Sequence, residues 1–339
     1  MRTRLLRVDP ERPAPADIAE AAAVLSRGGL VAFPTETVYG LGALALDAQA
    51  AARIYAAKGR PARNPTIVHV RDVAEARRCA SSWTEAAECL ARRFWPGPLT
   101  LVAQRAPCVP DVVTGAGDTV GLRCPAHQVA LALIRATGAP VAAPSANRSS
   151  RVSPTTAAHV LNGLDGRIDL VLDAGPCPGG LESTVVDVTA WPPRVLRPGP
   201  IAPSAIAAAA GAVAHTGEAP ATPEEPLRSP GLLSRHYAPR ARLECVEVSG
   251  RELALALAER GERVGWLAFG DPGDAASHRR LAAVAAMPRE PDAYARRLYA
   301  ALHEMDEAGV ARIVADLPPD YEAWLAVRDR LRRASAPGG

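Results

Sequence analysis

A stretch with almost nothing to bury interrupts this chain at residues 213–230. Its sequence, VAHTGEAPATPEEPLRSP, is rich in Pro, Ala, Thr and Glu, which is typical of a linker and not of a packed element. A chain of 339 residues is long enough for about two domains, each with its own core. We therefore predict a first domain over residues 1–212, a linker over residues 213–240 and a second domain over residues 241–339.

The second domain alternates between strand and helix patterns. The expected strands cover residues 242–248, 263–269 and 311–316, and the expected helices cover residues 250–260, 277–286, 291–309 and 320–335. This alternation favours a small parallel sheet. The domain has neither a glycine-rich dinucleotide loop nor a Walker-type Gly-Lys-Ser/Thr motif, so we expect it to be an accessory domain.

Composition excludes several classes of protein. The six cysteines have no zinc-type spacing, and we expect free thiols in a reducing compartment. The N-terminus lacks an apolar signal core and no run of about eighteen uncharged apolar residues occurs, so we expect a cytoplasmic protein without a membrane segment. The formal charge of +3 permits an anionic ligand but does not by itself indicate nucleic-acid binding.

One lysine stands out in the first domain. Of the 39 basic residues, 38 are Arg and the remaining one is Lys58, which lies at the end of an expected helix over residues 48–57. A compact ammonium and a planar guanidinium are not interchangeable where a charge must fit a tight anionic site. A genome-wide bias against Lys is the alternative explanation, but the neighbouring Arg60 and Asn64 favour a functional role.

Two further polar stretches follow expected strands. Residues 34–42 contain three hydroxyl side chains, a carboxylate and two glycines directly after the strand at residues 30–33, where α/β folds meet ligands. Residues 144–155 contain four serines, two arginines and an asparagine. We expect Ser153 to cap a helix that has Pro154 in its first turn, which would form a phosphate cradle.

The remaining polar candidates lie at strand ends. They include His69, Thr119, Arg123, Ser183 and Arg197, and Thr119 and Arg123 share one face of a strand because strand side chains alternate. Together with the residues around Lys58 they form a set of cations, amides and hydroxyls without a carboxylate pair or a Ser-His-Asp elbow. Such a set suits phosphate and carboxylate ligands and favours phosphoryl or nucleotidyl transfer. The residues alone do not name the acceptor.

Five motifs in order resemble the long form of the YrdC-type family. They are FPTETVYGLG at residues 33–42, KGRP with Asn64-Pro65, PSAN at residues 144–147, SPT at residues 153–155, and the linker SPG…RHYAP at residues 229–239. The family signature pairs Lys-x-Arg with Ser-x-Asn. The resemblance implies a twisted, open α/β sheet with a basic concave face, followed by a smaller Rossmann-like α/β domain.

The implied activity is synthesis of threonylcarbamoyl-AMP from L-threonine, bicarbonate and ATP, with release of pyrophosphate. Mg²⁺ would accompany ATP, no metal would be held by the protein itself, and partner proteins would transfer the threonylcarbamoyl group to adenosine beside the anticodon of tRNA. The implied catalytic residues are Lys58 and Arg60. The implied threonine site comprises Thr37, His69, Arg123, Ala143 and Ser183. The implied ATP site comprises Arg60, Asn64, Thr119, Ser145, Asn147, Ser153, Arg197 and Tyr237.

Three alternatives remain open at this point. A carbamoyl-adenylate-forming carbamoyltransferase uses the same fold, although this chain lacks the Cys-rich finger of those proteins. A non-catalytic module could hold RNA on the basic face, and weak direct RNA binding by an enzyme is a variant of that interpretation. A degenerate member of the family is disfavoured by the intact signature.

Overall fold

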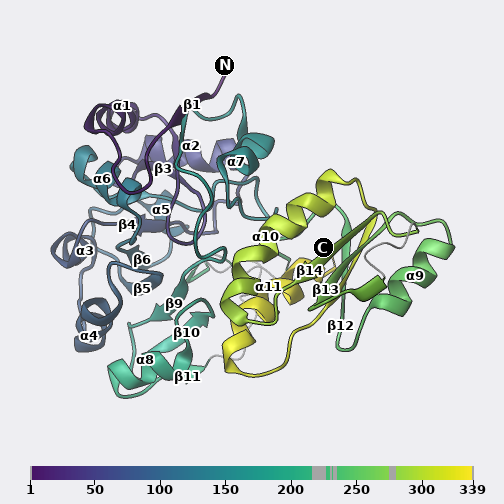
Figure 1. The fold of residues 1–339 in the computed structure, drawn as a ribbon. Coiled ribbons are helices and arrows are strands. Elements are labelled where there is room, and N and C mark those ends of the chain that lie inside the picture. Colours follow the sequence, from purple (N-terminus) through teal and green to yellow (C-terminus); the bar gives the residue numbers. More distant parts are fainter. Residues whose placement is uncertain (1, 216–226, 230, 232–234, 275–279, 338–339) are drawn as a thin grey trace. The chain divides into compact units, whose positions relative to one another are not determined.

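The computed structural model describes most of the chain in two compact units (Figure 1). The described residues are 2–215, 227–229, 231, 235–274 and 280–337. The first unit comprises residues 1–149, 154–178 and 182–232, and the second comprises residues 150–153, 179–181 and 233–339. Much of the predicted linker, including residues 216–226, 230 and 232–234, lies outside the described residues. The exact linker boundaries therefore stay a prediction.

The first unit is built on a mixed sheet flanked by helices. Its strands are β1 (Arg4–Arg7), β2 (Val31–Phe33), β3 (Gly40–Leu44), β4 (Ile67–His69), β5 (Leu99–Gln104), β6 (Thr119–Arg123), β7 (Val141–Ala142), β8 (Leu170–Asp173), β9 (Thr184–Asp187), β10 (Arg194–Arg197) and β11 (Ala214–His215). Its helices are α1 (Pro15–Ser26), α2 (Ala48–Lys58), α3 (Val73–Cys79), α4 (Glu85–Phe94), α5 (Asp111–Thr114), α6 (Gln128–Thr137), α7 (Ala157–Leu164) and α8 (Pro203–Ala210). Among the described residues the strand order is β1-β8-β2-β3-β7-β4-β6-β5-β9-β10-β11. The expected α/β class is confirmed.

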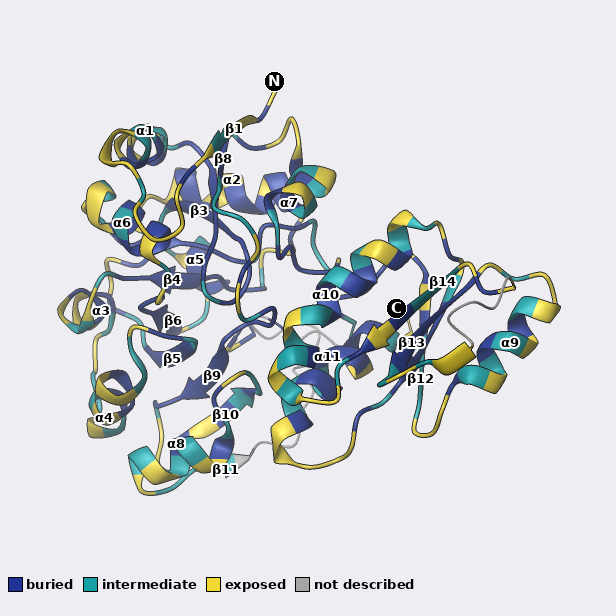
Figure 2. Cartoon of the chain, viewed as in Figure 1, coloured by how far each residue is buried: buried dark blue, intermediate teal, exposed yellow. Residues whose placement is uncertain are grey.

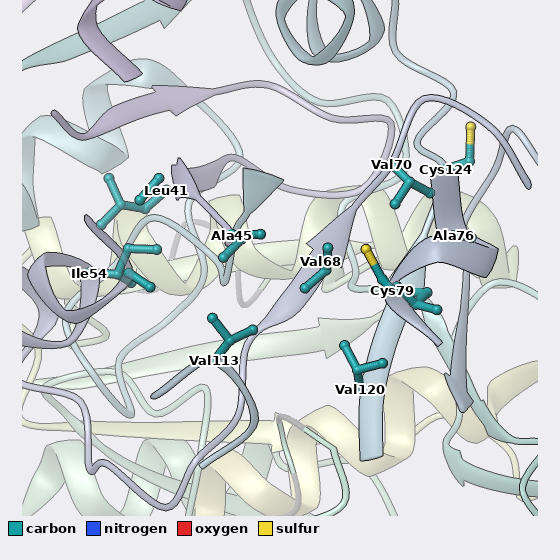
Figure 3. Packing of buried hydrophobic residues seen from close by; sticks show 14 of the residues in the cluster. Leu41, Ala45, Ile54, Val68, Val70, Ala76, Cys79, Val113, Val120 and Cys124 are labelled. Atoms are coloured by element: carbon teal, nitrogen blue, oxygen red, sulfur yellow. The ribbon is translucent and has the colours of Figure 1, made fainter. Parts of the chain in front are cut away.

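The alternation of side chains along the strands separates two apolar cores. Leu30, just before β2, and Ala32 pack into one cluster, whereas Val31 and Phe33 pack into the other together with residues of α1 and α6. Figure 2 shows the buried strands of the first unit in dark blue and the helices around them as partly exposed. Figure 3 shows part of the larger core, in which Val68 of β4 lies near Val120 of β6.

The same alternation turns polar side chains to one face of the sheet. Val68 and Leu122 point into the larger core, so their neighbours His69 and Arg123 point to the opposite face. His69 and Arg123 are register partners on the adjacent parallel strands β4 and β6. The sheet therefore brings together two candidate residues that are 54 positions apart in the sequence.

Local capping fixes where Lys58 lies. The side chain of Asp47 accepts hydrogen bonds from the backbone nitrogens of Gln49 and Ala50 and begins α2. Gly59 ends the helix in the left-handed conformation, with φ of 62°. Lys58 is consequently the last helical residue, as the sequence predicted.

The second unit contains a four-stranded parallel sheet. Its elements are β12 (Arg242–Val246), α9 (Arg251–Glu259), β13 (Val264–Phe269), β14 (Ala283–Met287), α10 (Pro291–Glu307), β15 (Arg312–Asp316), the 3₁₀ helix η2 (Glu322–Trp324) and α11 (Leu325–Ser335). The strand order is β12-β15-β13-β14. Asp316, at the end of β15, accepts hydrogen bonds from the backbone nitrogens of Gly250 and Phe269 and from the Trp266 indole. The carboxylate of Asp316 therefore joins three segments of this unit.

Two predictions of local structure are wrong. The expected helix over residues 277–286 is replaced by β14, which pairs with β13 from Ala283 onward, and residues 275–279 lie outside the described residues. The helix after the serine-rich stretch begins at Ala157 and is capped by Thr156, not by Ser153. Thr156 is the cap because its hydroxyl accepts a hydrogen bond from the backbone nitrogen of His159, three residues further along the chain.

The structure also bears on the expectations for the cysteines and for membrane-spanning helices. All six cysteines are free, as predicted: Cys79, Cys89, Cys108, Cys124, Cys177 and Cys245. In the part of the chain that the structure describes, every helix is too short or too polar to cross a membrane.

Candidate active site

Lys58 ties the two signature stretches together. Its Nζ donates hydrogen bonds to the backbone carbonyls of Ser145, at 2.5 Å, and of Asn147. In return, the backbone nitrogen of Ser149 donates to the carbonyl of Lys58 at 2.9 Å. Lys58 is only 1% exposed, and its burial together with the Arg60 charge holds its pKa well below the usual lysine range. In its protonated form Lys58 has three protons, so these two bonds leave one for a ligand.

Arg60 and Asn64 contact each other in the loop that follows Lys58. Arg60 donates through Nη2 to the Asn64 side-chain oxygen at 2.7 Å and through Nε to the Asn64 carbonyl at 3.0 Å. A further bond reaches the carbonyl of Pro65 at 2.5 Å. The buried Nδ2 of Asn64 has no hydrogen-bond partner among the described residues. This loop is thus held by its own arginine, with one amide donor left for another acceptor.

Arg123 is paired with a carboxylate from the stretch at residues 34–42. Its Nη2 donates to Glu36 Oε1 at 2.6 Å and to Thr37 Oγ1 at 2.9 Å. The Thr37 hydroxyl also lies 2.8 Å from the hydroxyl of Thr35. Arg123, 4% exposed, and Thr37 are brought together as expected, whereas the partnership with Glu36 was not foreseen from the sequence.

His69 is a neutral imidazole in this site. It points away from the larger core, and it is only 2% exposed. Burial and the nearby Arg123 charge lower the pKa of His69 to about 3. Nδ1 lies 3.3 Å from the carbonyl of Ile67, so Nδ1 carries the proton and Nε2 is left as an acceptor. A ligand hydroxyl is a suitable donor to Nε2.

Ser183 and Arg197 meet at the ends of β9 and β10. Arg197 donates through Nε and Nη2 to the carbonyl of Ser183, at 3.2 and 3.0 Å, and through Nη2 to its hydroxyl at 3.2 Å. The Ser183 hydroxyl is also 2.8 Å from the hydroxyl of Thr100 on β5. Thr100 is a second residue that sequence reasoning missed, because an isolated threonine inside a strand gives no signal.

The other predicted residues take separate positions. Thr119 begins β6 and is buried, on the same face as Arg123. Ala143 is buried, and its backbone nitrogen donates to the carbonyl of Ile67 at 2.8 Å.

Ser153 and Tyr237 belong to the second unit. There the carbonyl of Ser153 lies 3.1 Å from Nε2 of His303. The ring of Tyr237 stacks on Tyr299, with centroids 5.9 Å apart, beneath the guanidinium of Arg330. The structure thus groups the candidates into four contacts within the first unit and two buried positions in the second.

The donor set suits anions. Its polar atoms are mainly guanidinium, ammonium, amide and hydroxyl groups, and the carboxylate of Glu36 is already paired with Arg123. Among the described residues, no group of three His, Cys, Asp or Glu side chains is arranged to hold a metal ion.

Comparison with known families matches two models along this chain. Residues 23–199 match the Sua5/YciO/YrdC model, which is described as telomere recombination. Residues 201–336 match the C-terminal domain model of threonylcarbamoyl-AMP synthase. The two models meet near residue 200, ahead of the stretch predicted as a linker.

Curated relatives and solved structures agree with these models. A threonylcarbamoyl-AMP synthase of Pyrococcus abyssi is 43% identical over 322 residues, which cover 93% of each chain. A threonylcarbamoyl-AMP synthase of Bacillus subtilis is 42% identical over 325 residues, covering 94% of this chain and 92% of the relative. The crystal structure of P. abyssi Sua5 complexed with L-threonine has a TM-score of 0.90 and 41% identity, covering 98% of both chains.

Proposed function

We propose that this chain, which belongs to the threonylcarbamoyl-AMP synthase family, makes threonylcarbamoyl-AMP from L-threonine, bicarbonate and ATP and releases pyrophosphate. The observation that carries the proposal is the contact of Lys58 with the loop at residues 145–147, which joins both halves of the family signature in one buried place. The product serves the threonylcarbamoyl modification of adenosine in tRNA.

The threonine half of the site is assigned to the face of β4 and β6. Arg123 supplies a guanidinium for the substrate carboxylate. Neutral His69 offers Nε2 to the substrate hydroxyl, and this acceptor is retained at physiological pH because the pKa of His69 is near 3. Thr37, Ser183 and the backbone near Ala143 complete this half.

The nucleotide half is assigned to the loops on either side of Lys58. Arg60, Asn64, Ser145, Asn147 and Arg197 supply guanidinium, amide and hydroxyl donors, from which phosphate oxygens accept hydrogen bonds. Thr119 is proposed to contact the nucleotide as well, and the roles of Ser153 and Tyr237 stay predictions.

The chemistry requires only positioning and charge neutralisation from the protein. The threonine amine forms a C–N bond to the carbon of bicarbonate, which loses water to give a carbamate. A carbamate oxygen then attacks the α-phosphorus while pyrophosphate leaves in line. The remaining proton of Lys58 and the guanidinium groups of Arg60 and Arg197 stabilise the developing negative charge. Mg²⁺ would accompany ATP, since phosphate oxygens are among the ligands that it prefers.

The partners proposed for this enzyme follow from its labile product. Proteins that transfer the threonylcarbamoyl group to tRNA would consume the product. Weak direct binding of RNA remains a subsidiary proposal, for which the mild positive charge of the chain gives only limited support.

Pyrophosphate release from ATP tests the function. Purified protein with Mg²⁺ and bicarbonate should release pyrophosphate only when L-threonine is added, and liquid chromatography should detect the threonylcarbamoyl adenylate. Release without any dependence on threonine would indicate another acceptor on the same fold. Absence of release, together with tight RNA binding, would contradict the enzymatic proposal.

A further inference from the structure

The Arg123–Glu36 ion pair has two buried atoms without partners. Both hydrogen bonds of Arg123 use Nη2, and the buried Nε donates to none of the residues that the structure describes. The second carboxylate oxygen of Glu36, Oε2, is likewise buried and accepts from none of them. A buried polar atom without a partner costs about 1–3 kcal/mol, and more where the group is charged. Within this ion pair, Arg123 Nε therefore lacks an acceptor and Glu36 Oε2 lacks a donor.

An α-amino acid supplies both missing groups. Its carboxylate is an acceptor for the guanidinium of Arg123, and its ammonium is a donor for Glu36. The charges also balance, because the ion pair is neutral and a zwitterion adds no net charge to the buried site. A carboxylic acid without an amine would instead add one uncompensated negative charge beside Glu36, which is expensive in a buried environment.

We propose that Glu36 accepts the ammonium group of the amino-acid substrate, and thereby acts as a positioning and specificity residue beside Arg123. This inference rests on the proposed function. Arg123 alone would attract any small carboxylate. Glu36 repels those that lack an amine, so specificity arises from a repulsive element as well as from an attractive one.

The position of Glu36 supports this role. The residue stands between Thr35 and Thr37, whose hydroxyls are bonded to each other, and Thr35 also donates to the carbonyl of Val38 at 2.6 Å. This turn fixes the backbone that carries Glu36. The carboxylate side chain nevertheless retains 15% exposure, compared with 5% for the side chain of Arg123. Glu36 is thus the more accessible partner of the pair.

Calorimetric titration of three ligands tests the proposal. The ligands are L-threonine, 2,3-dihydroxybutanoate, which has a hydroxyl in place of the amine, and threoninol, which has an alcohol in place of the carboxylate. The wild-type protein should bind L-threonine at least about tenfold more tightly than the dihydroxy acid. In Glu36→Gln this preference should collapse, because threonine binding weakens while dihydroxybutanoate binding is unchanged or improved. Glu36→Asp should restore part of the preference.

Controls separate this role from a structural one. Glu11→Gln removes an exposed carboxylate of the same unit and should leave all three affinities unchanged. The KM for ATP should also be unaffected in Glu36→Gln, whose fold is checked by thermal unfolding. Equal weakening of threonine and dihydroxybutanoate in Glu36→Gln would overturn the proposal, since Glu36 would then only hold Arg123 in place. Unchanged threonine affinity would overturn it too. Failure of the wild-type protein to bind threonine would overturn the proposed function itself.

Discussion

Lys58 Nζ lies 2.5 Å from the backbone carbonyl oxygen of Ser145, 87 residues away along the chain. The carbonyl of Asn147 accepts a second bond from the same nitrogen. A side chain that donates to two carbonyls of one loop fixes that loop, and the loop carries the Ser-x-Asn half of the family signature. Lys58 is therefore both a charge and a structural tie.

Removal of Lys58 should abolish most of the activity. Lys58→Ala removes a cation and releases the loop at residues 145–147, and loss of one preorganised donor costs about 3 kcal/mol of barrier, or more than about a hundredfold in rate. Lys58→Arg should be nearly as inactive, because a planar fork does not fit the buried space of a compact ammonium. Threonine-dependent release of pyrophosphate measures both variants. Arg92→Ala, on the exposed surface of α4, is the control and should behave as wild type. Near-native turnover in Lys58→Ala would contradict this role.

The sequence predicted this contact only in part. Lys58 was recognisable because it is the single lysine, and Gly59 directly after it is a local signal for the end of a helix. Its acceptors are backbone carbonyls, however, and no sequence pattern marks a carbonyl. The ion pair of Arg123 with Glu36 was missed for a related reason, since it spans 87 residues and depends on strand pairing.

The error at β14 has a different physical cause. The sequence LAAVAAM at residues 281–287 is rich in good helix formers, so local propensity favours a helix. In the structure Val284 is instead paired with Trp266 and Ala286 with Ala268 in the edge strand of a parallel sheet. Pairing with β13 overrides the local helix propensity of residues 281–287. The sequence of that segment alone does not show this pairing.

Stability should fall in acid because His69 is buried as a neutral ring. The pKa of His69 is lowered to about 3, whereas that of an unfolded histidine is near 6.5. Between these values the unfolded chain holds a proton at this position that the folded chain lacks, so the free energy of unfolding decreases as pH falls below about 6.5. One such group contributes a slope of up to about 1.4 kcal/mol per pH unit.

Urea denaturation of wild type and His69→Gln at several pH values measures this slope. The variant should show a shallower loss of stability between about pH 6.5 and pH 5, because it lacks the titrating group. The ring proton signals of His69 in an NMR titration should stay constant between about pH 5 and pH 8. A midpoint near 6.5 in that titration would show that the ring is not held neutral.

Asp316 should be essential for the stability of the second unit. Its two carboxylate oxygens accept from the nitrogens of Gly250, Phe269 and Trp266. Asp316→Ala would leave three donors without an acceptor, at about 1–3 kcal/mol each. Denaturation followed by the fluorescence of Trp266 and Trp324 should therefore show a loss of at least about 3 kcal/mol.

A matched control isolates the role of the Asp316 carboxylate. Asp292→Asn changes an exposed carboxylate of the same unit and should shift the transition little. Asp316→Asn should be intermediate, since an amide can accept from two of the three donors but turns a donor toward the third. Equal stability of Asp316→Ala and wild type would mean that water replaces the carboxylate without cost.

Replacement of glycine by alanine should have opposite effects on stability at Gly199 and at Gly163. A Cβ at Gly199 would lie 2.3 Å from the backbone nitrogen of Thr184 and 2.6 Å from the carbonyl carbon of Ser183. These are backbone atoms at the start of β9, so Gly199→Ala must displace the segment that Arg197 and Ser183 share. We expect a lower free energy of unfolding and weaker threonine binding, because Ser183 belongs to the proposed threonine site.

Gly163, inside α7, has only ordinary contacts at 3.7 Å or more, and Gly163→Ala should stabilise the protein by roughly 0.5–1 kcal/mol. Thermal unfolding and calorimetric titration with L-threonine should separate the two variants. Unaltered threonine affinity in Gly199→Ala would show that the site does not depend on this close approach of β9 and β10.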